Sequence, residues 1–529
     1  MSTETVTPEL NTYDEVPYAS FPFAQTHPNR LATVATLFGM QPKRPDDCRV
    51  LELGCASGGN IIPMAVSLPK SEFVGIDLSS RQIALGQETV DSLRLGNIEL
   101  LCRSIADVTP NMGQFDYIVC HGVWSWVAHD VRKKIFEICA EQLTPQGVAY
   151  ISYNTYPGWH LRGSVRDMMF YHTRNLKEPR ERVGQARALL DFLVRSVPEE
   201  KGAYPMLLKG EMELLRNKGD YYLLHEHLEH VNEPVYFYEF EAQASAERLQ
   251  FLGEADIGSM LAEDLGSDVQ PILNHVAKNV IEREQYLDFL RNRTFRQTLL
   301  CHKDLELNRR PDYERVRKLY VASPVQPLEG SVNVISNEES KFKGVHGTVS
   351  TPDPLMKAAL LRLGQRWPEA ISFQDLLVAI QQELYNEPVV TAARINRDAS
   401  SLVSNLIQCY IRKFVDFYAV PSRCQMAVSE RPQASPLARS QAQGGKVITN
   451  LNHEVVEISD LPRHVLQLLD GSRDRQSLLN AMVELLDRGE IVIPATTNAS
   501  GEPTDVRMVL ADTLDKVLHQ LGRDCLLLA

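Results

Sequence analysis

The most constraining stretch of this sequence is residues 50–60, which read Val-Leu-Glu-Leu-Gly-Cys-Ala-Ser-Gly-Gly-Asn. The first four residues have the apolar pattern of a buried strand, with Glu52 near its tip. The small residues from Gly54 to Gly59 then form a loop. A ligand can lie close to such a backbone, because no large side chain pushes it away. The stretch therefore predicts a ligand-binding turn between a strand and a helix.

The next apolar run, residues 73–77, ends in Asp77, about 20 residues after the loop, which is the spacing of a βαβ unit that holds a ribose. A dinucleotide-binding fold has the same two features. Its glycine loop, however, usually follows an apolar strand with no acid immediately before the first glycine. Glu52 therefore favours S-adenosylmethionine over NAD. A glycine turn in an unrelated α/β protein is the alternative.

Strand-like and helical patterns alternate along the first part of the chain. Apolar, β-branched runs predict strands, and the segments between them have helical spacing, as does the segment 31–38 before the first strand. This alternation is typical of a parallel, doubly wound α/β sheet. The expected strands are residues 49–53, 73–76, 98–102, 115–120 and 147–153.

Three further motifs follow in order. Ser-Ile-Ala-Asp at 104–107 comes after the third expected strand, where Asp107 is either a ligand contact or a helix N-cap. The fourth strand leads into the segment 121–126, which begins with His121 and contains Trp124. Leu-Thr-Pro-Gln-Gly at 143–147 predicts a turn before the fifth strand.

Together these motifs resemble those of class I S-adenosylmethionine-dependent methyltransferases, whose first motif is an acid followed by three spaced glycines; Ala56 stands at the middle glycine here. The resemblance implies a Rossmann-like domain, S-adenosylmethionine as cofactor and S-adenosylhomocysteine as product. It places the loop backbone against the methionine part of the cofactor, Asp77 against the ribose and Asp107 against adenine. The cofactor contacts expected from it are Glu52, Gly54, Cys55, Ala56, Gly58, Asp77, Leu78, Ile105, Ala106, Asp107 and His121.

The methyl acceptor should lie beyond the carboxyl ends of the strands, where loops of open α/β sheets line the ligand crevice. The catalytic candidates there are His121, Trp124, Tyr153 and Asn154. Tyr18 and Trp159 are further candidates for the site. His121 or Tyr153 is the candidate to accept or relay a proton. For each of these residues the alternative is a packing role.

An N-terminal arm precedes the first helix, and it contains Phe21 and Phe23. In class I methyltransferases such an arm commonly folds over the cofactor. The alternative is that the two aromatic rings merely fasten the arm to the core.

Composition excludes several classes of function. A net charge of −13 argues against broad binding of nucleic acid, which normally requires a basic surface. The nine cysteines are scattered without Cys-x-x-Cys pairs, as expected for a reduced, cytoplasmic protein. Neither a signal peptide nor an apolar run of membrane-spanning length is found, so no membrane insertion is expected. The His-Glu-His-Leu-Glu-His run at 225–230 lacks a metal-ligand spacing, and no metal is predicted.

The rest of the chain reads as additional domains. Residues 225–260 and 285–296 resemble the methyltransferase regulatory domain that is fused to certain bacterial class I enzymes. The better-characterised relatives are methyltransferases that modify lysines of outer-membrane proteins, which implies a protein-lysine acceptor and a homodimer. The expected division is an arm (1–30), a methyltransferase domain (31–160), a helical regulatory domain (161–330) and two winged-helix-like modules (331–430 and 446–529).

The sequence thus predicts a methyltransferase that transfers methyl groups to lysine side chains of a protein. One alternative is a small-molecule or lipid methyltransferase of a biosynthetic pathway, for which an enclosed, deep acceptor pocket is expected. The other is a cofactor-binding scaffold without turnover. Intact acidic positions at Glu52, Asp77 and Asp107 argue against the scaffold.

Overall fold

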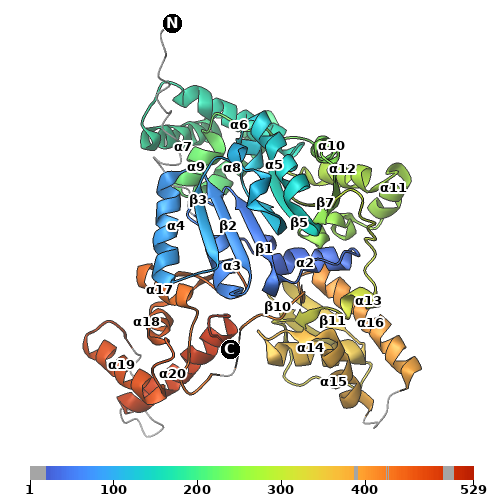
Figure 1. The fold of residues 1–529 in the computed structure, drawn as a ribbon, viewed down its shortest axis with the longest axis vertical. Coiled ribbons are helices and arrows are strands. Elements are labelled where there is room, and N and C mark those ends of the chain that lie inside the picture. The colour runs from blue at the N-terminus through green and yellow to red at the C-terminus, as the bar shows by residue number, and fades with distance from the viewer. Residues whose placement is uncertain (1–19, 386–390, 425, 427, 493–504, 529) are drawn as a thin grey trace.

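A mixed seven-stranded sheet lies at the centre of the protein (Figure 1). The computed structural model describes residues 20–385, 391–424, 426, 428–492 and 505–528; Tyr18 lies outside them. The strand order is β3-β2-β1-β4-β5-β7-β6, and only β7 runs antiparallel to its neighbours. The strands are β1 (Arg49–Leu53), β2 (Glu72–Asp77), β3 (Ile98–Cys102), β4 (Phe115–Cys120), β5 (Leu143–Asn154), β6 (Leu249–Glu254) and β7 (Phe295–His302).

The five strands expected from the sequence are confirmed, with one difference in extent. β5 begins at Leu143, so the segment 143–147 belongs to the strand and does not form the expected turn. The register between β4 and β5 shifts in this segment. β6 and β7 were not predicted from the sequence, because they come from the segment expected to be helical. Together they extend the sheet beyond β5 and so widen its carboxyl edge.

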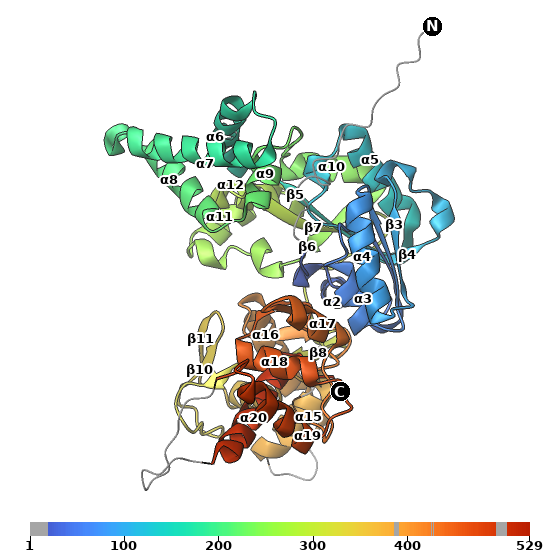
Figure 2. The same cartoon turned by 90° about the vertical axis from the view of Figure 1, so that its left-hand side faces the viewer.

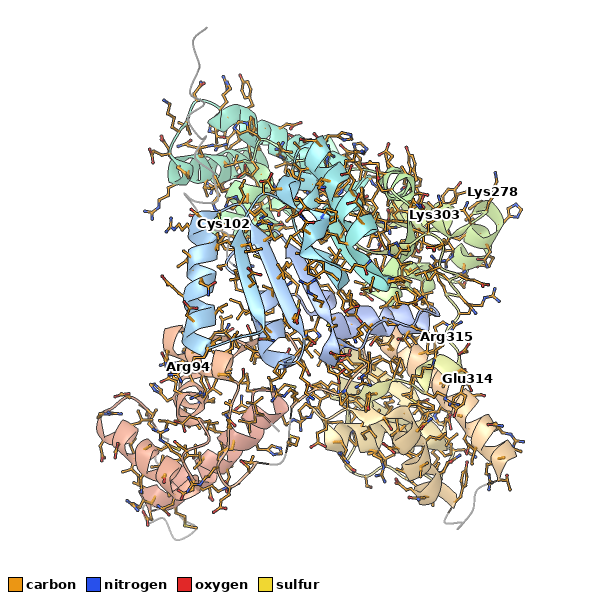
Figure 3. All side chains as sticks on the ribbon, viewed as in Figure 1. Arg94, Cys102, Lys278, Lys303, Glu314 and Arg315 are labelled. Atoms are coloured by element: carbon orange, nitrogen blue, oxygen red, sulfur yellow. The ribbon has the colours of Figure 1, made fainter. Side chains whose placement is uncertain are left out.

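Helices cover both faces of this sheet because side chains alternate along each strand. In β1, Val50 packs with α2, α3 and α4, whereas Leu51 packs with α5 and α10. The covering helices are α2 (Pro28–Leu37), α3 (Ile61–Ser67), α4 (Ser80–Leu93), α5 (His129–Gln142) and α10 (Phe237–Ala246). Arg315 lies at the carboxyl end of α2 and donates to the carbonyl of Leu37 at 3.1 Å (Figure 3).

A helical layer projects from one end of the sheet (Figure 2). Its first four helices enclose a small core of their own. Hydrogen bonds occupy two of its histidines: His225 pairs with Glu229 at 3.1 Å and His227 with Glu211 at 2.8 Å. The helices are α6 (Gly158–Thr173), α7 (Pro179–Ser196), α8 (Ala203–Arg216), α9 (Asp220–His227), α11 (Val269–Val276) and α12 (Val280–Arg291).

Two C-terminal modules lie side by side below the sheet (Figures 1 and 2). The first contains α13 (Tyr313–Val316), β8 (Tyr320–Ala322), β9 (Gln326–Pro327), β10 (Ser340–Gly344), β11 (Gly347–Thr351), α14 (Pro354–Arg366), β12 (Ile371–Ser372), α15 (Phe373–Tyr385), α16 (Ala392–Ile411) and β13 (Asp416–Tyr418). The second contains α17 (Pro436–Gly444), β14 (Val447–Thr449), β15 (Val455–Glu457), α18 (Asp460–Leu468), α19 (Arg475–Asp487) and α20 (Val506–Arg523). No helix in the described part of the chain has the length and apolar character needed to cross a membrane.

Short 3-10 helices fill several connections. They are η1 (Ala24–Thr26), η2 (Pro45–Asp47), η3 (Ile105–Asp107), η4 (Pro110–Met112), η5 (Trp124–Trp126), η6 (Glu199–Lys201), η7 (Ile257–Met260) and η8 (Glu263–Leu265).

A buried ion cluster joins the regulatory segment to the sheet. The guanidinium of Arg296, on β7, is fully buried. It donates to Asp288 of α12 at 2.8 Å, to Glu254 of β6 at 2.6 Å and to Glu284 at 3.2 Å. Because charges removed from water must be compensated locally, this cluster fixes α12 against β6 and β7.

We expect Arg296→Met to lower the free energy of unfolding by about 3–5 kcal/mol, because the carboxylates that remain buried lose their partner. Urea unfolding measures the change. Arg317→Met is the matched control, since Arg317 pairs with Glu314 at the surface and should change stability by less than about 0.5 kcal/mol. Equal losses for the two variants would contradict the assignment.

Candidate active site

The turn after β1 takes its shape from residues in the left-handed backbone region. Gly54 and Gly58 both have φ +77°, and Ala56 has φ +47°. Alanine is strained there by about 1–2 kcal/mol, which is the cost of the departure from glycine at this position. The amide of Gly54 donates to the carbonyl of Ile76 at 2.8 Å, so the end of β1 is held against the end of β2.

Glu52 is a buried acid at the tip of β1. Its Oε1 accepts a hydrogen bond from Asn60 Nδ2 at 2.7 Å, and its Oε2 has no partner among the described residues. Burial raises the pKa of this carboxyl group to about 8. A buried acceptor without a partner is uncommon in folded proteins, and a cationic ammonium group would satisfy it. The amino group of the methionine part of S-adenosylmethionine fits this requirement.

Asp77 links the turn to the following helix. Its Oδ2 accepts from the amide of Ala56 at 2.8 Å, and its Oδ1 accepts from the amide of Ser79 at 2.9 Å. The carboxylate therefore lies beside the turn at the carboxyl end of β2, where the family places a ribose.

Exposed residues follow β2 and β3 at the same carboxyl edge of the sheet. Leu78 is 65% exposed, and its carbonyl lies 3.7 Å from the thiol of Cys102, which Figure 3 labels at the carboxyl end of β3. Ile105 is half-buried, and Ala106 and Asp107 are exposed in η3. An apolar surface flanked by a carboxylate suits an adenine ring and its exocyclic amine.

The N-terminal arm packs on the same turn. Ser20 Oγ accepts from the amide of Gly59 at 2.8 Å, and the amide of Phe23 donates to Asn60 Oδ1 at 2.9 Å. The ring centroid of Phe23 lies 3.8 Å from that of His121. The arm thus contacts both the turn after β1 and the residue that follows β4.

His121 is held as a neutral ring. Burial lowers its pKa to about 3, and its Nδ1 lies 2.9 Å from the hydroxyl of Tyr150 and 3.3 Å from Ser152 Oγ. Burial also raises the pKa of Tyr150, so its phenol keeps a proton to donate to Nδ1. With Nδ1 occupied and its pKa so low, His121 is poorly suited to accept a proton from an acceptor. Its ring instead forms part of the wall of the site beside the turn after β1.

An open cavity of about 830 Å³ lies next to this wall. Phe295 lines it and contacts the ring of His121 edge-on, with a centroid separation of 6.1 Å. In the β5–β7 pairing Phe295 lies opposite Asn154, and Gln297 opposite Ser152, so the cavity sits at the carboxyl edge of the sheet. It is lined by Glu254, Asp256, Gly258, Ser259, Leu261, Glu263, Asp264, Arg291, Asn292, Arg293, Thr294, Phe295, Gln297, Ile411, Arg412 and Lys413.

Two catalytic candidates lie elsewhere. Trp124 and Tyr153 are buried in the core on the opposite face of the sheet, where both rings pack on Phe240 and the Tyr153 hydroxyl bonds Thr298 at 3.2 Å. Tyr153 alternates with Ser152, and only the latter faces His121. The structure therefore corrects the expectation that Trp124 and Tyr153 wall the acceptor site.

The other two candidates have structural contacts. Asn154 Nδ2 donates to Asn232 at 2.9 Å, which holds its amide at the end of β5. Trp159 is buried and packs edge-on against Trp126, so it does not form a rim. The loop that carries it nevertheless supports the cavity, because the amide of Gly158 donates to the carbonyl of Arg293 at 3.0 Å.

Sequence reasoning missed Phe295 and Gln297. The signal available was the short apolar run at 299–301, but nothing local to that run indicates which strand it pairs with.

Comparisons with known families and proteins agree with this geometry. Three family models match the chain: a methyltransferase domain at residues 50–147, a predicted methyltransferase regulatory domain at 219–302, and the PKMT C-terminal winged helix domain at 430–526. An uncharacterised protein of Rickettsia prowazekii is 35% identical over 525 residues, covering 98% of this chain and 94% of that protein. A second protein of that organism is 38% identical over 240 residues, covering 45% of this chain and 96% of its own.

Solved structures give the same picture over nearly the whole chain. PKMT2 from Rickettsia typhi, also solved in complex with AdoHcy, has a TM-score of 0.84 and 28% identity, and the match covers 97% of this chain and 100% of that one.

The raised pKa of Glu52 predicts a pH-dependent affinity for S-adenosylhomocysteine. Below about pH 8 the carboxyl group holds a proton that must leave before it can pair with a cationic amino group. The affinity should therefore rise by up to about tenfold per pH unit towards pH 8 and then level off. Isothermal titration calorimetry across this range measures it.

The control for this prediction is Glu52→Gln, which removes the titrating carboxyl group. Titration of the ligand's own amino group affects both proteins equally, so the difference between their slopes belongs to Glu52. Identical slopes for the two proteins would contradict the prediction.

Proposed function

This chain belongs to the S-adenosylmethionine-dependent methyltransferases that carry a methyltransferase regulatory domain and a PKMT C-terminal winged helix domain, and we propose that it methylates lysine side chains of a protein. Its cofactor is S-adenosylmethionine and its product S-adenosylhomocysteine. The lysine acceptor is supported by the resemblance of residues 225–260 and 285–296 to regulatory domains of bacterial protein-lysine methyltransferases, and by the cavity beside His121.

Different residues at the carboxyl ends of β1, β2 and β3 are proposed to bind different parts of the cofactor. Glu52 is proposed to bind the amino group, Asp77 the ribose and Asp107 the adenine amine, with Leu78, Ile105 and Ala106 flanking the base. When bound, the cofactor supplies a methyl carbon on a sulfonium, which an amine lone pair attacks in line while the S–C bond breaks, leaving S-adenosylhomocysteine. The nitrogen then releases one proton to water. Alignment and exclusion of water are therefore the main tasks of the chain.

The open cavity is the observation that carries the acceptor assignment. It adjoins His121 through Phe295, and it opens to solvent instead of enclosing a small molecule. A cavity of this kind suits a side chain presented by a macromolecule. An enclosed pocket would instead have favoured the small-molecule alternative.

The carboxylates of the cavity suit a lysine ammonium group. Asp256 already binds one, because Lys413 Nζ of the chain itself lies 2.8 Å from its Oδ2. Glu263 pairs similarly with Arg412 at 3.4 Å. Both acids remain partly exposed, so a lysine from another protein can exchange with these partners. We propose that Asp256 attracts the acceptor to the cavity mouth.

Aromatic rings at the inner end favour the neutral amine that the displacement needs. Phe23 and Phe295 flank the uncharged ring of His121. Removing an ammonium group from water lowers its pKa, so this wall favours loss of the proton before transfer. The same faces hold the remaining charged form by cation–π contact.

A homodimer is our second proposal about partners. The projecting helices α6, α7 and α8 expose large apolar side chains, including Tyr171 at 68%, Phe192 at 61% and Met206 at 75%. Such apolar exposure is typical of a protein interface. We expect a mass of twice 59.7 kDa by sedimentation velocity, and Phe192→Asp with Met206→Asp should shift it to the monomer. A monomeric wild-type chain would contradict this proposal.

A reducing compartment such as the cytoplasm is proposed from the thiols. All nine cysteines, every one of them among the described residues, are free, and all but Cys102 are buried. Cell fractionation with an antibody to the chain tests this location.

We expect methyl-labelled S-adenosylmethionine, incubated with the enzyme and a host lysate, to label protein at lysine. The lysate is separated into protein, nucleic acid and small-molecule fractions, and labelled protein is hydrolysed to identify methylated lysine. Label confined to small molecules would overturn the proposal in favour of a biosynthetic enzyme, and label in nucleic acid would also contradict it. Cofactor binding without any transfer would indicate a scaffold.

Two matched variants connect that activity to the cavity. Once a labelled acceptor protein is identified, Asp256→Asn should raise the KM for that protein about two- to fivefold, because the substitution removes one exposed charge pair. The affinity for the cofactor should not change. Asp268→Asn, an exposed acid outside the cavity, should change neither value.

A further inference from the structure

One residue of the C-terminal winged helix domain contacts the cofactor turn directly. His453 lies in the tight connection between β14 and β15, and its Nε2 is 2.8 Å from Asn60 Oδ1. The two residues are 393 positions apart in the sequence. Asn60 follows the glycine loop and is the N-cap of α3, so this contact joins the far end of the chain to the cofactor site.

The carboxamide of Asn60 is a junction between three parts of the protein. Its Nδ2 donates to Glu52 Oε1 at 2.7 Å. Its Oδ1 accepts from the amide of Phe23 at 2.9 Å, from Thr26 Oγ1 at 3.1 Å and from His453 at 2.8 Å. The side chain is buried. One amide group therefore links the acid that we assign to the cofactor's amino group, the arm over the site, and the C-terminal domain.

His453 is fixed as a hydrogen-bond donor. It is 1% exposed and has φ +64°, and its amide donates to the carbonyl of Asn450 at 3.1 Å. Burial, with a smaller contribution from His27, lowers its pKa, so the ring is neutral. Because a carboxamide oxygen only accepts, the single ring proton must lie on Nε2. The Nδ1 atom has no partner within the described residues.

We propose that His453 is a positioning residue of the methyltransferase: by donating to Asn60 Oδ1, it fixes the orientation of the carboxamide that holds Glu52 and the N-terminal arm at the cofactor site. This inference rests on the cofactor site proposed above and extends it to the C-terminal domain.

The orientation of Asn60 matters because its two ends are chemically different. Rotation of the carboxamide by half a turn would present Nδ2, a donor, to the backbone amide of Phe23, which also only donates. This change replaces a hydrogen bond by a repulsive contact between two donors. A third donor on Oδ1, from a rigid and buried histidine, adds to the preference for the orientation observed.

The same contact explains how the arm stays on the turn. Phe23 and Thr26 are both tied to Asn60 Oδ1, and the Phe23 ring covers His121. The ring of His453 also lies against His27, the residue that ends the arm and caps α2, with ring centroids 5.3 Å apart. The C-terminal domain therefore contacts the arm directly at His27 and is linked through Asn60 to Phe23 and Thr26.

Two substitutions of similar size test the role of the donor. His453→Asn tolerates the left-handed backbone but is too short to reach Asn60, whereas His453→Gln can place an amide donor near the position of Nε2. We expect His453→Asn to weaken S-adenosylhomocysteine binding about three- to tenfold by calorimetry, and His453→Gln to restore most of this loss. The exposed His519, on α20 of the same domain, supplies the control His519→Asn, which should bind as the wild type does.

Hydrogen exchange of the arm separates positioning from simple packing. In His453→Asn, the amides of residues 20–27 should exchange faster, because the acceptor on Asn60 is no longer held. If His453 only packed within the β14–β15 hairpin, His453→Asn would lower the melting temperature without changing hydrogen exchange in the arm or the affinity for S-adenosylhomocysteine. That pattern would overturn the proposal, as would equal affinities for His453→Asn and His453→Gln.

Failure of the underlying site has a different signature. If the wild type binds no S-adenosylhomocysteine, or if Glu52→Gln binds it as tightly as the wild type, the proposed cofactor site is wrong. If the wild type binds S-adenosylhomocysteine, Glu52→Gln binds it more weakly, and the His453 variants bind it as the wild type does, the cofactor site is supported and the role of the C-terminal domain is refuted.

Discussion

The hydrogen bond between Asn60 and Glu52 is the interaction on which the rest of this structure depends. It places a buried carboxyl group at the tip of β1 with one oxygen satisfied and the other without a partner among the described residues. The same Asn60 side chain receives the arm and His453. Removing a carboxyl group from water is unfavourable unless it is paired, so this arrangement makes sense when a cationic ligand completes it. The proposed cofactor site thus draws on residues far apart in the chain.

The carboxyl edge of the sheet has two halves with different chemistry. Around β1, β2 and β3, the edge carries Glu52, Asp77 and Asp107, which are proposed to bind a charged, polar cofactor. Around β5, β7 and β6, it opens into the cavity lined by Phe295 and Asp256. His121 stands between the halves as a neutral ring, covered by Phe23 on one side and touching Phe295 on the other. Because donor and acceptor are proposed to meet directly beside this uncharged wall, the transfer has little need of a protein base beside the reacting atoms.

Much of the half of this edge around β1, β2 and β3 could be predicted from the sequence, because its signals are local. A strand, an acid, a glycine turn and a second acid lie within a few tens of residues, and the five parallel strands followed from their apolar runs. The second half could not be predicted. Phe295 reaches the site through a strand that pairs with β5 from a distant part of the chain, and pairing partners are not encoded locally. Tyr153 was misassigned because the sequence shows alternation but not which face of the strand meets the site. Trp124 lies in η5, and the sequence does not show that this turn packs its ring into the core. His453 carries no local signal at all.

Donor and acceptor are proposed to meet at His121, between these two halves. A crystal structure of the protein with S-adenosylhomocysteine and a lysine peptide tests this arrangement. We expect the amino group of the product on Glu52 Oε2, its ribose on Asp77, and its sulfur facing the cavity, with the lysine nitrogen in line between Phe23 and Phe295. A product bound away from Glu52, or a sulfur turned from the cavity that holds the peptide, would contradict it.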